Sequence, residues 1–240
     1  MSLSKLFCSP QKSINLKRER RKDARPGELL AAALDLFVEK GFAATRAEEV
    51  AQRAGVSKGT LFLYFTSKEE LFKAVVRENI SGHYPNWHEQ MQAYSGSTAD
   101  MLHLCAQGWW EHIGATKASG ISKLMMAEGS NFPDLSRFYQ DEVIEPGNAM
   151  ILRILQRGVE RGEFREVNLK YAVHSFVAPL LYLAVWKHSV GPGQAPSLQL
   201  NPQAFLTAQV DTLLHGLCMQ ADVKTAPPPT NLITEGNRES

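Results

Sequence analysis

Cysteine is scarce in this 240-residue chain, and its three cysteines show no pairing pattern. Cys8, Cys105 and Cys218 are widely spaced and form no Cys-x-x-Cys pair. Such a set predicts neither a disulfide framework nor a zinc knuckle, and it is typical of a reducing compartment. We therefore expect no metal site and no cofactor. A redox-sensing thiol is the alternative, although a lone cysteine in a helix is more often a small apolar filler.

Long hydrophobic runs are missing as well. The longest run, 176–186, has 11 residues and includes Pro179, whereas a membrane-spanning helix needs about 20 apolar residues. Near the N-terminus, Leu3, Leu6 and Phe7 are scattered among polar residues, unlike the apolar core of a signal peptide. We expect a cytoplasmic protein with no membrane partner.

A large excess of charge of either sign is absent, but the charges are unevenly placed. The whole chain has a net charge of +1, whereas residues 1–80 carry 15 Lys and Arg against 10 Asp and Glu. The basic N-terminal part therefore precedes an acidic remainder, a division that favours contact of one end with a polyanion such as nucleic acid. An ordinary solvated surface is the alternative.

Strand signals are also lacking, because β-branched residues do not alternate with polar ones over any length. Apolar residues recur instead at the three-to-four spacing of amphipathic helices, which predicts an all-α fold. The first helix is expected to begin near Pro26 and to end before Gly41, and two capping signals follow, at Thr45 with Glu48 and at Ser67 with Glu70. Further helices are expected near 98–115, 119–129, 134–145, 147–162, 169–189 and 203–219, with Pro146 dividing two of them.

Residues 43–71 have the spacing of a helix-turn-helix. Two short helices, 46–54 and 58–65, are joined at Gly55, whose residue type permits the positive φ of a sharp interhelical turn. The small Ala51 lets the helices approach closely, and Val56 fills the angle between them. This geometry would offer the second helix to the DNA major groove.

The start of that second helix carries groups suited to phosphate. Ser57, Lys58 and Thr60 place hydroxyl and ammonium donors beside free backbone N–H groups, and Gly59 lets the backbone approach DNA. Further phosphate contacts are expected from Tyr64, Lys68 and, on the preceding helix, Arg46. Phe62 has two open roles, contact with thymine methyl groups or packing.

The order Ala-Gly-Val-Ser-Lys-Gly-Thr-Leu, followed by aromatic residues and Ser-Lys-Glu-Glu-Leu, resembles the DNA-binding motif of the TetR/AcrR family. The resemblance covers about 26–80 and implies a homodimeric regulator whose recognition helices enter successive major grooves of a palindromic operator. It also implies DNA contacts for six residues, namely Thr45, Ser57, Lys58, Thr60, Tyr64 and Lys68. The pair Phe62-Leu63 departs from the family, many members of which have Tyr first.

The chain is expected to divide into four parts. Residues 1–25 would be a flexible basic arm, 26–80 the three-helix DNA-binding domain, 81–220 the larger helical domain for effector binding and dimerisation, and 221–240 a disordered tail. The arm has two open roles, contact with the DNA minor groove or a solvated leader.

Aromatic and methionine residues in the larger domain suggest an effector pocket for an apolar or aromatic molecule. The expected lining is Trp109, Trp110, Met125, Phe132, Tyr139, Phe176 and Tyr182. Plain core packing is the alternative for each of them. The last two helices are the expected dimer interface, through Leu180, Leu183, Val210, Leu213, Leu214 and Leu217, as in the family.

The sequence thus indicates a DNA-binding transcriptional regulator, a repressor that a small effector releases from its operator. An activator, or a DNA-binding protein without a small-molecule effector, is the alternative within the family. Enzyme motifs such as Gly-x-Ser-x-Gly, a phosphate-binding loop with Gly-Lys-Ser/Thr, or His-Glu-x-x-His are absent from the sequence. We therefore expect no enzymatic activity.

Overall fold

The computed structural model describes the backbone of residues 11–217 and the side chains of residues 26–217. Within these ranges every regular element is helical, as predicted. The tail predicted over 221–240, and the first ten residues of the predicted arm, lie outside the described residues.

The first helix, α1 (Gln11–Ala44), begins well before Pro26, so residues 11–25 are helical where we expected a flexible arm. Gly41 interrupts the regular helix with φ 85° and ψ 171°. The predicted stop at this glycine is therefore real, but the predicted start is wrong. A proline suits a first helical turn, yet it does not require one.

Three short helices follow: α2 (Ala47–Arg53), α3 (Lys58–Tyr64) and α4 (Lys68–Asn79). The turn between α2 and α3 uses Gly55 at φ 68°, as the sequence predicts. The hydroxyl groups of Ser57 and Ser67 accept the predicted capping bonds from Thr60 N and Glu70 N, each at 3.1 Å.

An aromatic cluster forms the core of this N-terminal part. Phe37, Phe42 and Phe72 are fully buried, and their ring centroids lie 5.3–5.6 Å apart. Separations in this range give favourable stacked and edge-to-face contacts in addition to burial. The rings come from α1, the turn around Gly41 and α4, so the cluster fixes the helix-turn-helix on its supporting helices.

The larger C-terminal part, called the body from here on, begins with a short 3-10 turn, η1 (Ser81–His83). The remaining elements are α5 (Tyr84–Ala93), α6 (Thr98–Trp109), η2 (Trp110–Gly114), α7 (Ser119–Glu128), η3 (Gly129–Asn131), α8 (Pro133–Tyr139), η4 (Gln140–Ile144), α9 (Glu145–Glu160), α10 (Leu169–His188), η5 (Gly191–Gly193), η6 (Pro196–Leu198) and α11 (Pro202–Leu217).

Pro146 does not divide two helices. The chain stays helical from α8 to α9 through η4, a π-helical turn that ends just before this proline. Where π hydrogen bonding changes to α hydrogen bonding, some backbone groups have no partner within the helix. A proline at this position therefore costs little, because the N–H that it lacks would have no helical acceptor. The predicted break is therefore wrong.

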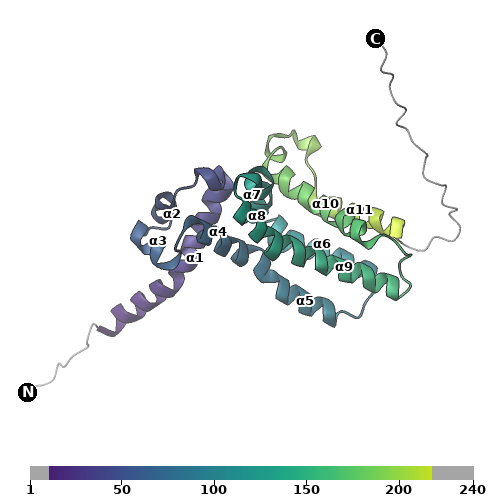
Figure 1. Ribbon diagram of the computed structural model, residues 1–240, viewed down its shortest axis with the longest axis horizontal. Helices are drawn as coiled ribbons and strands as arrows, with labels where there is room; N and C mark the ends of the chain where they lie inside the picture. Colours follow the sequence, from purple (N-terminus) through teal and green to yellow (C-terminus); the bar gives the residue numbers. More distant parts are fainter. Residues whose placement is uncertain (1–10, 218–240) are drawn as a thin grey trace, which may run out of the picture.

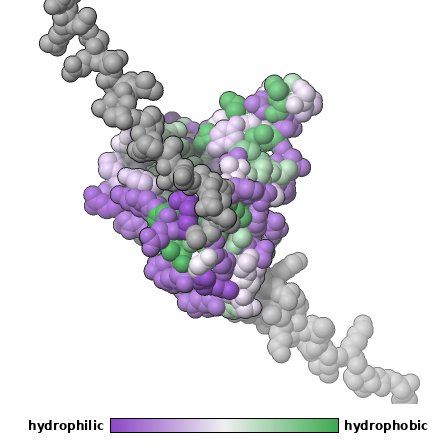
Figure 2. All heavy atoms as spheres, turned by 90° about the vertical axis from the view of Figure 1, so that its right-hand side faces the viewer, coloured by the Kyte–Doolittle hydropathy of each residue, from purple (hydrophilic) through white to green (hydrophobic). Residues whose placement is uncertain are grey.

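The small N-terminal helices lie at one end of the molecule and the longer helices of the body at the other (Figure 1). The end away from α2 and α3 is largely hydrophilic, with apolar residues in small patches (Figure 2). By length and composition alone α10 could span a membrane, but it packs against α7, α9 and α11.

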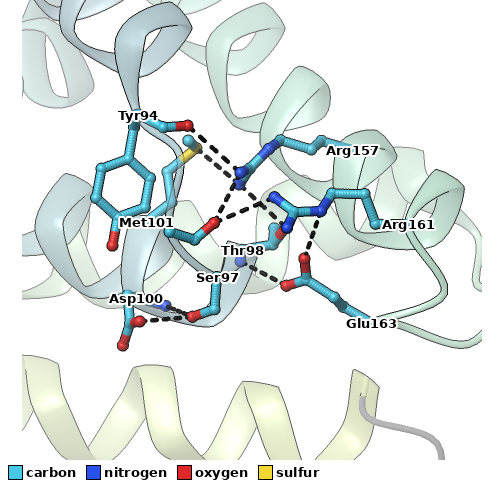
Figure 3. Close-up of polar contacts among 9 residues, drawn as sticks. Tyr94, Ser97, Thr98, Asp100, Met101, Arg157, Arg161 and Glu163 are labelled. Atoms are coloured by element: carbon cyan, nitrogen blue, oxygen red, sulfur yellow. Dashed lines mark hydrogen bonds and ion pairs between the residues drawn. The ribbon is translucent and has the colours of Figure 1, made fainter.

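A polar network joins the loop between α5 and α6 to α9 (Figure 3). The Arg157 guanidinium donates to Gly96 O at 2.8 Å, to Tyr94 O at 3.4 Å and to Thr98 Oγ1 at 3.2 Å. The Glu163 carboxylate accepts from Thr98 N and pairs with Arg161 Nε at 2.9 Å. These bonds fix the far end of α5, a helix with few other contacts to the body.

We expect Arg157→Met to lower the free energy of unfolding by about 2 kcal/mol, because three partly buried acceptors lose a charged donor. The melting temperature should fall by roughly 4–8 °C. Arg153→Met on the same helix is the matched control, since Arg153 is exposed and bonds chiefly to Ala149 O in its own turn. Equal shifts in thermal melts of the two variants would argue against the network as a structural tie.

Candidate DNA interface and effector cavity

The N-terminal end of α3 is an exposed polar surface. Ser57, Lys58 and Gly59 are exposed, and Thr60 is half-buried with its hydroxyl 2.9 Å from Ser57 Oγ. Exposed hydroxyl, ammonium and backbone N–H groups at a helix start can bind a phosphate. Arg46 is exposed on the neighbouring turn, so the structure leaves these five predicted contacts accessible.

The middle of α3 presents apolar side chains to solvent. Leu63 is 84% exposed and Phe62 38% exposed. The Lys58 ammonium lies 5.7 Å from the Phe62 ring centroid and pairs with Glu48. Exposed apolar residues on a groove-facing helix can contact thymine methyl groups, so Phe62 keeps that role as a prediction. Tyr64 is half-buried and packs against the N-terminal core.

Two of the expected DNA contacts, Thr45 and Lys68, have polar groups that bond within the protein, so their contact with DNA stays a prediction without support from this geometry. Thr45 is 1% exposed, and its hydroxyl donates to Leu36 O at 3.1 Å and to Gly41 O at 2.7 Å. It does not cap α2 either, since Arg46 is the N-cap and Arg46 N donates to Glu49 Oε2 at 3.3 Å. The Thr45 side chain therefore fastens the turn to α1.

Lys68 also bonds within the protein. Its ammonium donates to three carbonyl oxygens, those of Phe42 at 2.8 Å, Thr45 at 3.0 Å and Ala43 at 3.4 Å, and it lies 4.3 Å from the Phe42 ring centroid. The Phe42 and Ala43 carbonyls belong to the last turn of α1, where carbonyl oxygens have no partner within the helix, and the Thr45 carbonyl follows directly after it. Lys68 therefore ties α4 to the turn before α2, and its donors are already engaged.

The two lysines give a salt-dependence prediction. For Lys58→Ala we expect weaker operator binding and a slope of log affinity against log salt that is smaller by about 1, because one phosphate contact is lost. For Lys68→Met we expect a lower melting temperature and an unchanged slope. Fluorescence anisotropy with a DNA duplex at several salt concentrations measures both. An unchanged slope for Lys58→Ala would remove it from the phosphate contacts.

A cavity of about 530 Å³ lies in the body, within the size range of small-molecule sites. Four predicted residues line it, Trp109, Met125, Tyr139 and Phe176. Three do not. Trp110 packs in the core under Lys187, Phe132 packs on Phe42 with centroids 4.8 Å apart, and Tyr182 is 52% exposed beside Phe205 on the surface. The sequence could not separate these three residues from the other four. Helical spacing shows which face of a helix is apolar, but it does not show which other element packs on that face.

Several lining residues were not expected from the sequence. Tyr84 and Trp87 on α5, Ser122 on α7 and His174 on α10 also line the cavity. The Ser122 and Tyr139 hydroxyl groups are 3.2 Å apart, and Tyr84 donates to Val143 O at 3.1 Å. A buried serine on an apolar helix was the one signal available in the sequence, since such a hydroxyl needs a partner.

Cys105 also lines the cavity, and burial raises the pKa of its thiol to about 12. At neutral pH it is therefore a thiol rather than the reactive thiolate of a redox sensor. Within residues 26–217, no three His, Cys, Asp or Glu side chains gather into a group suited to a metal ion.

The expected dimer residues are mostly internal. Leu180, Leu183, Val210 and Leu217 are at most 7% exposed and pack in the core of their own chain. Leu213 and Leu214 are half-buried. Burial in their own chain gives the four residues little surface to offer a partner. The sequence did not show this, because α10 is apolar around much of its circumference and its periodicity does not identify the outer face. The outward apolar residues on α10 are Tyr171, Leu181 and Tyr182.

Side chains of the body hold the N-terminal part, which carries the helix-turn-helix, at three places. Glu128, at the end of α7, accepts from Ala43 N at 2.9 Å, and Lys117 bonds Asp35 at 2.6 Å. Arg77 on α4 pairs twice with Glu142, and these bonds hold the pKa of the Glu142 carboxyl below its usual value. The elements that line the cavity, α7 and η4, therefore also contact α1 and α4.

Two family models match the chain. Residues 29–75 match bacterial regulatory proteins of the tetR family, and residues 94–198 match the tetracyclin repressor-like C-terminal domain. HTH-type transcriptional regulator RutR of Escherichia coli K12 is 50% identical over 62 residues, 26% of this chain and 29% of RutR. The chain thus matches less than a third of that relative's length.

Longer matches are more distant. HTH-type transcriptional repressor KstR2 of Mycobacterium tuberculosis is 26% identical over 175 residues, 71% of this chain and 84% of KstR2. The structure of FadR from Bacillus subtilis in complex with stearoyl-CoA has a TM-score of 0.62 at 17% identity and covers 79% of this chain and 97% of FadR. That likeness shows the fold. With both of its parts matched by family models, the chain belongs to the TetR family of bacterial transcriptional regulators.

Proposed function

We propose that the protein is a cytoplasmic, homodimeric repressor that leaves a palindromic operator when a small, largely apolar or aromatic molecule fills the cavity. One observation carries the proposal. The cavity is bounded by the same helices that hold the DNA-reading part in place. KstR2 is named a repressor and FadR was solved with stearoyl-CoA, which supports an effector-controlled repressor here.

In this proposal residues 26–80 bind DNA, and residues 81–220 bind the effector and form the dimer. Ile80, at the end of α4, belongs to the cavity wall, and so do Met125 and Met126 on α7, close to Glu128. A ligand that prefers a different spacing of these helices would move α4 and the turn before α2. In the DNA-binding state the two recognition helices would lie roughly 34–36 Å apart.

The strength of the response is set by differential affinity. A ligand that binds both conformational states with equal affinity does not change their populations. To move the ratio of the two states from 1:99 to 99:1, a ligand must bind the favoured state about 10⁴-fold more tightly than the other. An effective ligand must therefore change the shape of the cavity rather than merely occupy it.

The test is a gel-shift titration with DNA from the gene's own promoter region. Compounds that raise the melting temperature of the free protein are added to the protein–DNA complex, and loss of the shifted band is the expected result. Full DNA binding at a saturating compound concentration would contradict repressor release. Tighter DNA binding with compound would favour the activator alternative.

A control variant separates the two activities. Lys58→Glu reverses a charge at the start of α3, far along the chain from the cavity residues. We expect it to lose DNA binding and to keep the same thermal shift with every compound. If the compound response disappears as well, the two sites are not independent in the way proposed.

A further inference from the structure

The cavity has an uncharged lining. Among the described residues that line it, none is Asp, Glu, Lys or Arg, and most of the wall is aromatic or aliphatic. A ligand charge buried there would lose its hydration without gaining an ionic partner, a large cost. The wall therefore selects against carboxylates and amines, at least for the part of the ligand that enters.

One pair of hydroxyl groups in this wall has a donor to spare. Ser122 and Tyr139 are each 7% exposed, and their oxygens lie 3.2 Å apart. Two hydroxyl protons are present, but the bond between the oxygens uses only one. Among the described residues, neither side chain has another hydrogen-bond partner. A buried donor without an acceptor is unfavourable, and an acceptor on a ligand would remove that penalty.

The other hydroxyl groups of the wall are already used. Tyr84 donates to Val143 O at 3.1 Å and Ser136 donates to Gly129 O at 2.7 Å. Burial raises the pKa of the Tyr139 phenol, so this group remains a neutral donor. Among the described hydroxyl groups of the wall, the Ser122–Tyr139 pair is therefore the one with a proton to spare, and the other polar side chains of the lining are Gln140, Asn148 and His174.

From this arrangement we propose that the effector is an uncharged aromatic molecule with a carbonyl-type oxygen that accepts the spare proton of the Ser122–Tyr139 pair. The inference rests on the proposed function, because binding of this molecule would control DNA release only if the protein is an effector-controlled repressor. It adds the chemical class of the ligand and the two side chains that recognise it.

Three compounds of similar shape test the class. Benzophenone has two rings and a neutral carbonyl, diphenylmethane has the rings without the carbonyl, and diphenylacetate has the rings with a carboxylate. We expect benzophenone to bind the full chain in isothermal titration at neutral pH, and diphenylacetate to bind at least ten-fold more weakly. Comparable binding of diphenylacetate, or no binding of benzophenone, would overturn the proposal.

Two near-isosteric substitutions test the hydroxyl pair. In the double variant Ser122→Ala/Tyr139→Phe, affinity for benzophenone should fall about five- to ten-fold, the usual worth of one neutral hydrogen bond. Affinity for diphenylmethane should stay within about two-fold. Tyr139→Phe alone should have a smaller effect on benzophenone, because the Ser122 proton is then free to bind it.

Ser136→Ala is the matched control, since it removes a cavity hydroxyl whose proton is already bonded to Gly129. It should leave both affinities unchanged. Equal losses for the two compounds in the double variant, or no loss for either, would reject the hydroxyl pair as the recognition element. If benzophenone binds as expected but leaves the operator complex intact, repressor release fails for this ligand while the proposed recognition stands.

Discussion

Gly41→Ala should lower the free energy of unfolding by about 3 kcal/mol and the melting temperature by roughly 6–12 °C. Two costs add. Gly41 has φ 85° and ψ 171°, a region that side-chain-bearing residues rarely adopt. A Cβ built there would also overlap Glu128 Oε1, so the carboxylate would lose its 2.9 Å bond from Ala43 N. Thermal melts measure the effect.

Two further variants separate these costs. Glu128→Ala removes the overlap, so Gly41→Ala should cost less in the Glu128→Ala background than in the native chain. Gly59→Ala is the glycine control, because Gly59 is helical and a Cβ there would meet only Ser57 Oγ, at 3.7 Å. We expect no loss of stability from Gly59→Ala. A Gly41→Ala protein that melts like the native one would show that this turn tolerates a side chain.

The local signals in the sequence were enough to predict the helix-turn-helix. Gly55 at the turn and Ser57 and Ser67 as caps act within a few residues of their own position, and the structure places each as expected. Thr45 and Lys68 could not be assigned in this way. Their polar groups bond to carbonyls 4 to 26 residues away, and a motif records the residue type without the direction in which the side chain points.

The body was harder to predict for a related reason. Helical spacing identified the apolar faces, but faces of different helices meet only through the tertiary fold. Met125 therefore reached the cavity as predicted, whereas Phe132, close to it in sequence, packs on Phe42 instead. On α10 the buried Leu183 and the exposed Tyr182 are neighbours in one unbroken run of aliphatic and aromatic residues, so the sequence alone did not separate core from surface.

The exposed residues of α10 offer a surface for a dimer. The outward face of α10 and the adjoining face of α11 form a continuous surface, since the Tyr182 and Phe205 rings lie 5.7 Å apart across the two helices. Exposed Ala204 and Ala208 on α11 would let a second helix approach closely. We propose that two copies of the chain pair through this surface.

In Tyr182→Asp a charge would be buried without a partner at the centre of the proposed interface, so we expect a monomer. Operator affinity should fall at least 100-fold, because each half-site would then be bound independently. Light scattering gives the mass, and anisotropy with operator DNA gives the affinity. The fold of the single chain should persist, since Tyr182 is 52% exposed and substitutions at exposed positions seldom destabilise a domain strongly.

Leu152→Asp is the matched control, because Leu152 is a partly exposed apolar residue on α9 (37% exposed), outside α10 and α11. It should stay dimeric and bind the operator as the native protein does. A Leu213 variant would be less informative, since Leu213 is half-buried in its own chain and its loss would also damage the core. If Tyr182→Asp remains a dimer with native affinity, the two copies meet through another surface, and the spacing of their recognition helices must be set elsewhere in the body.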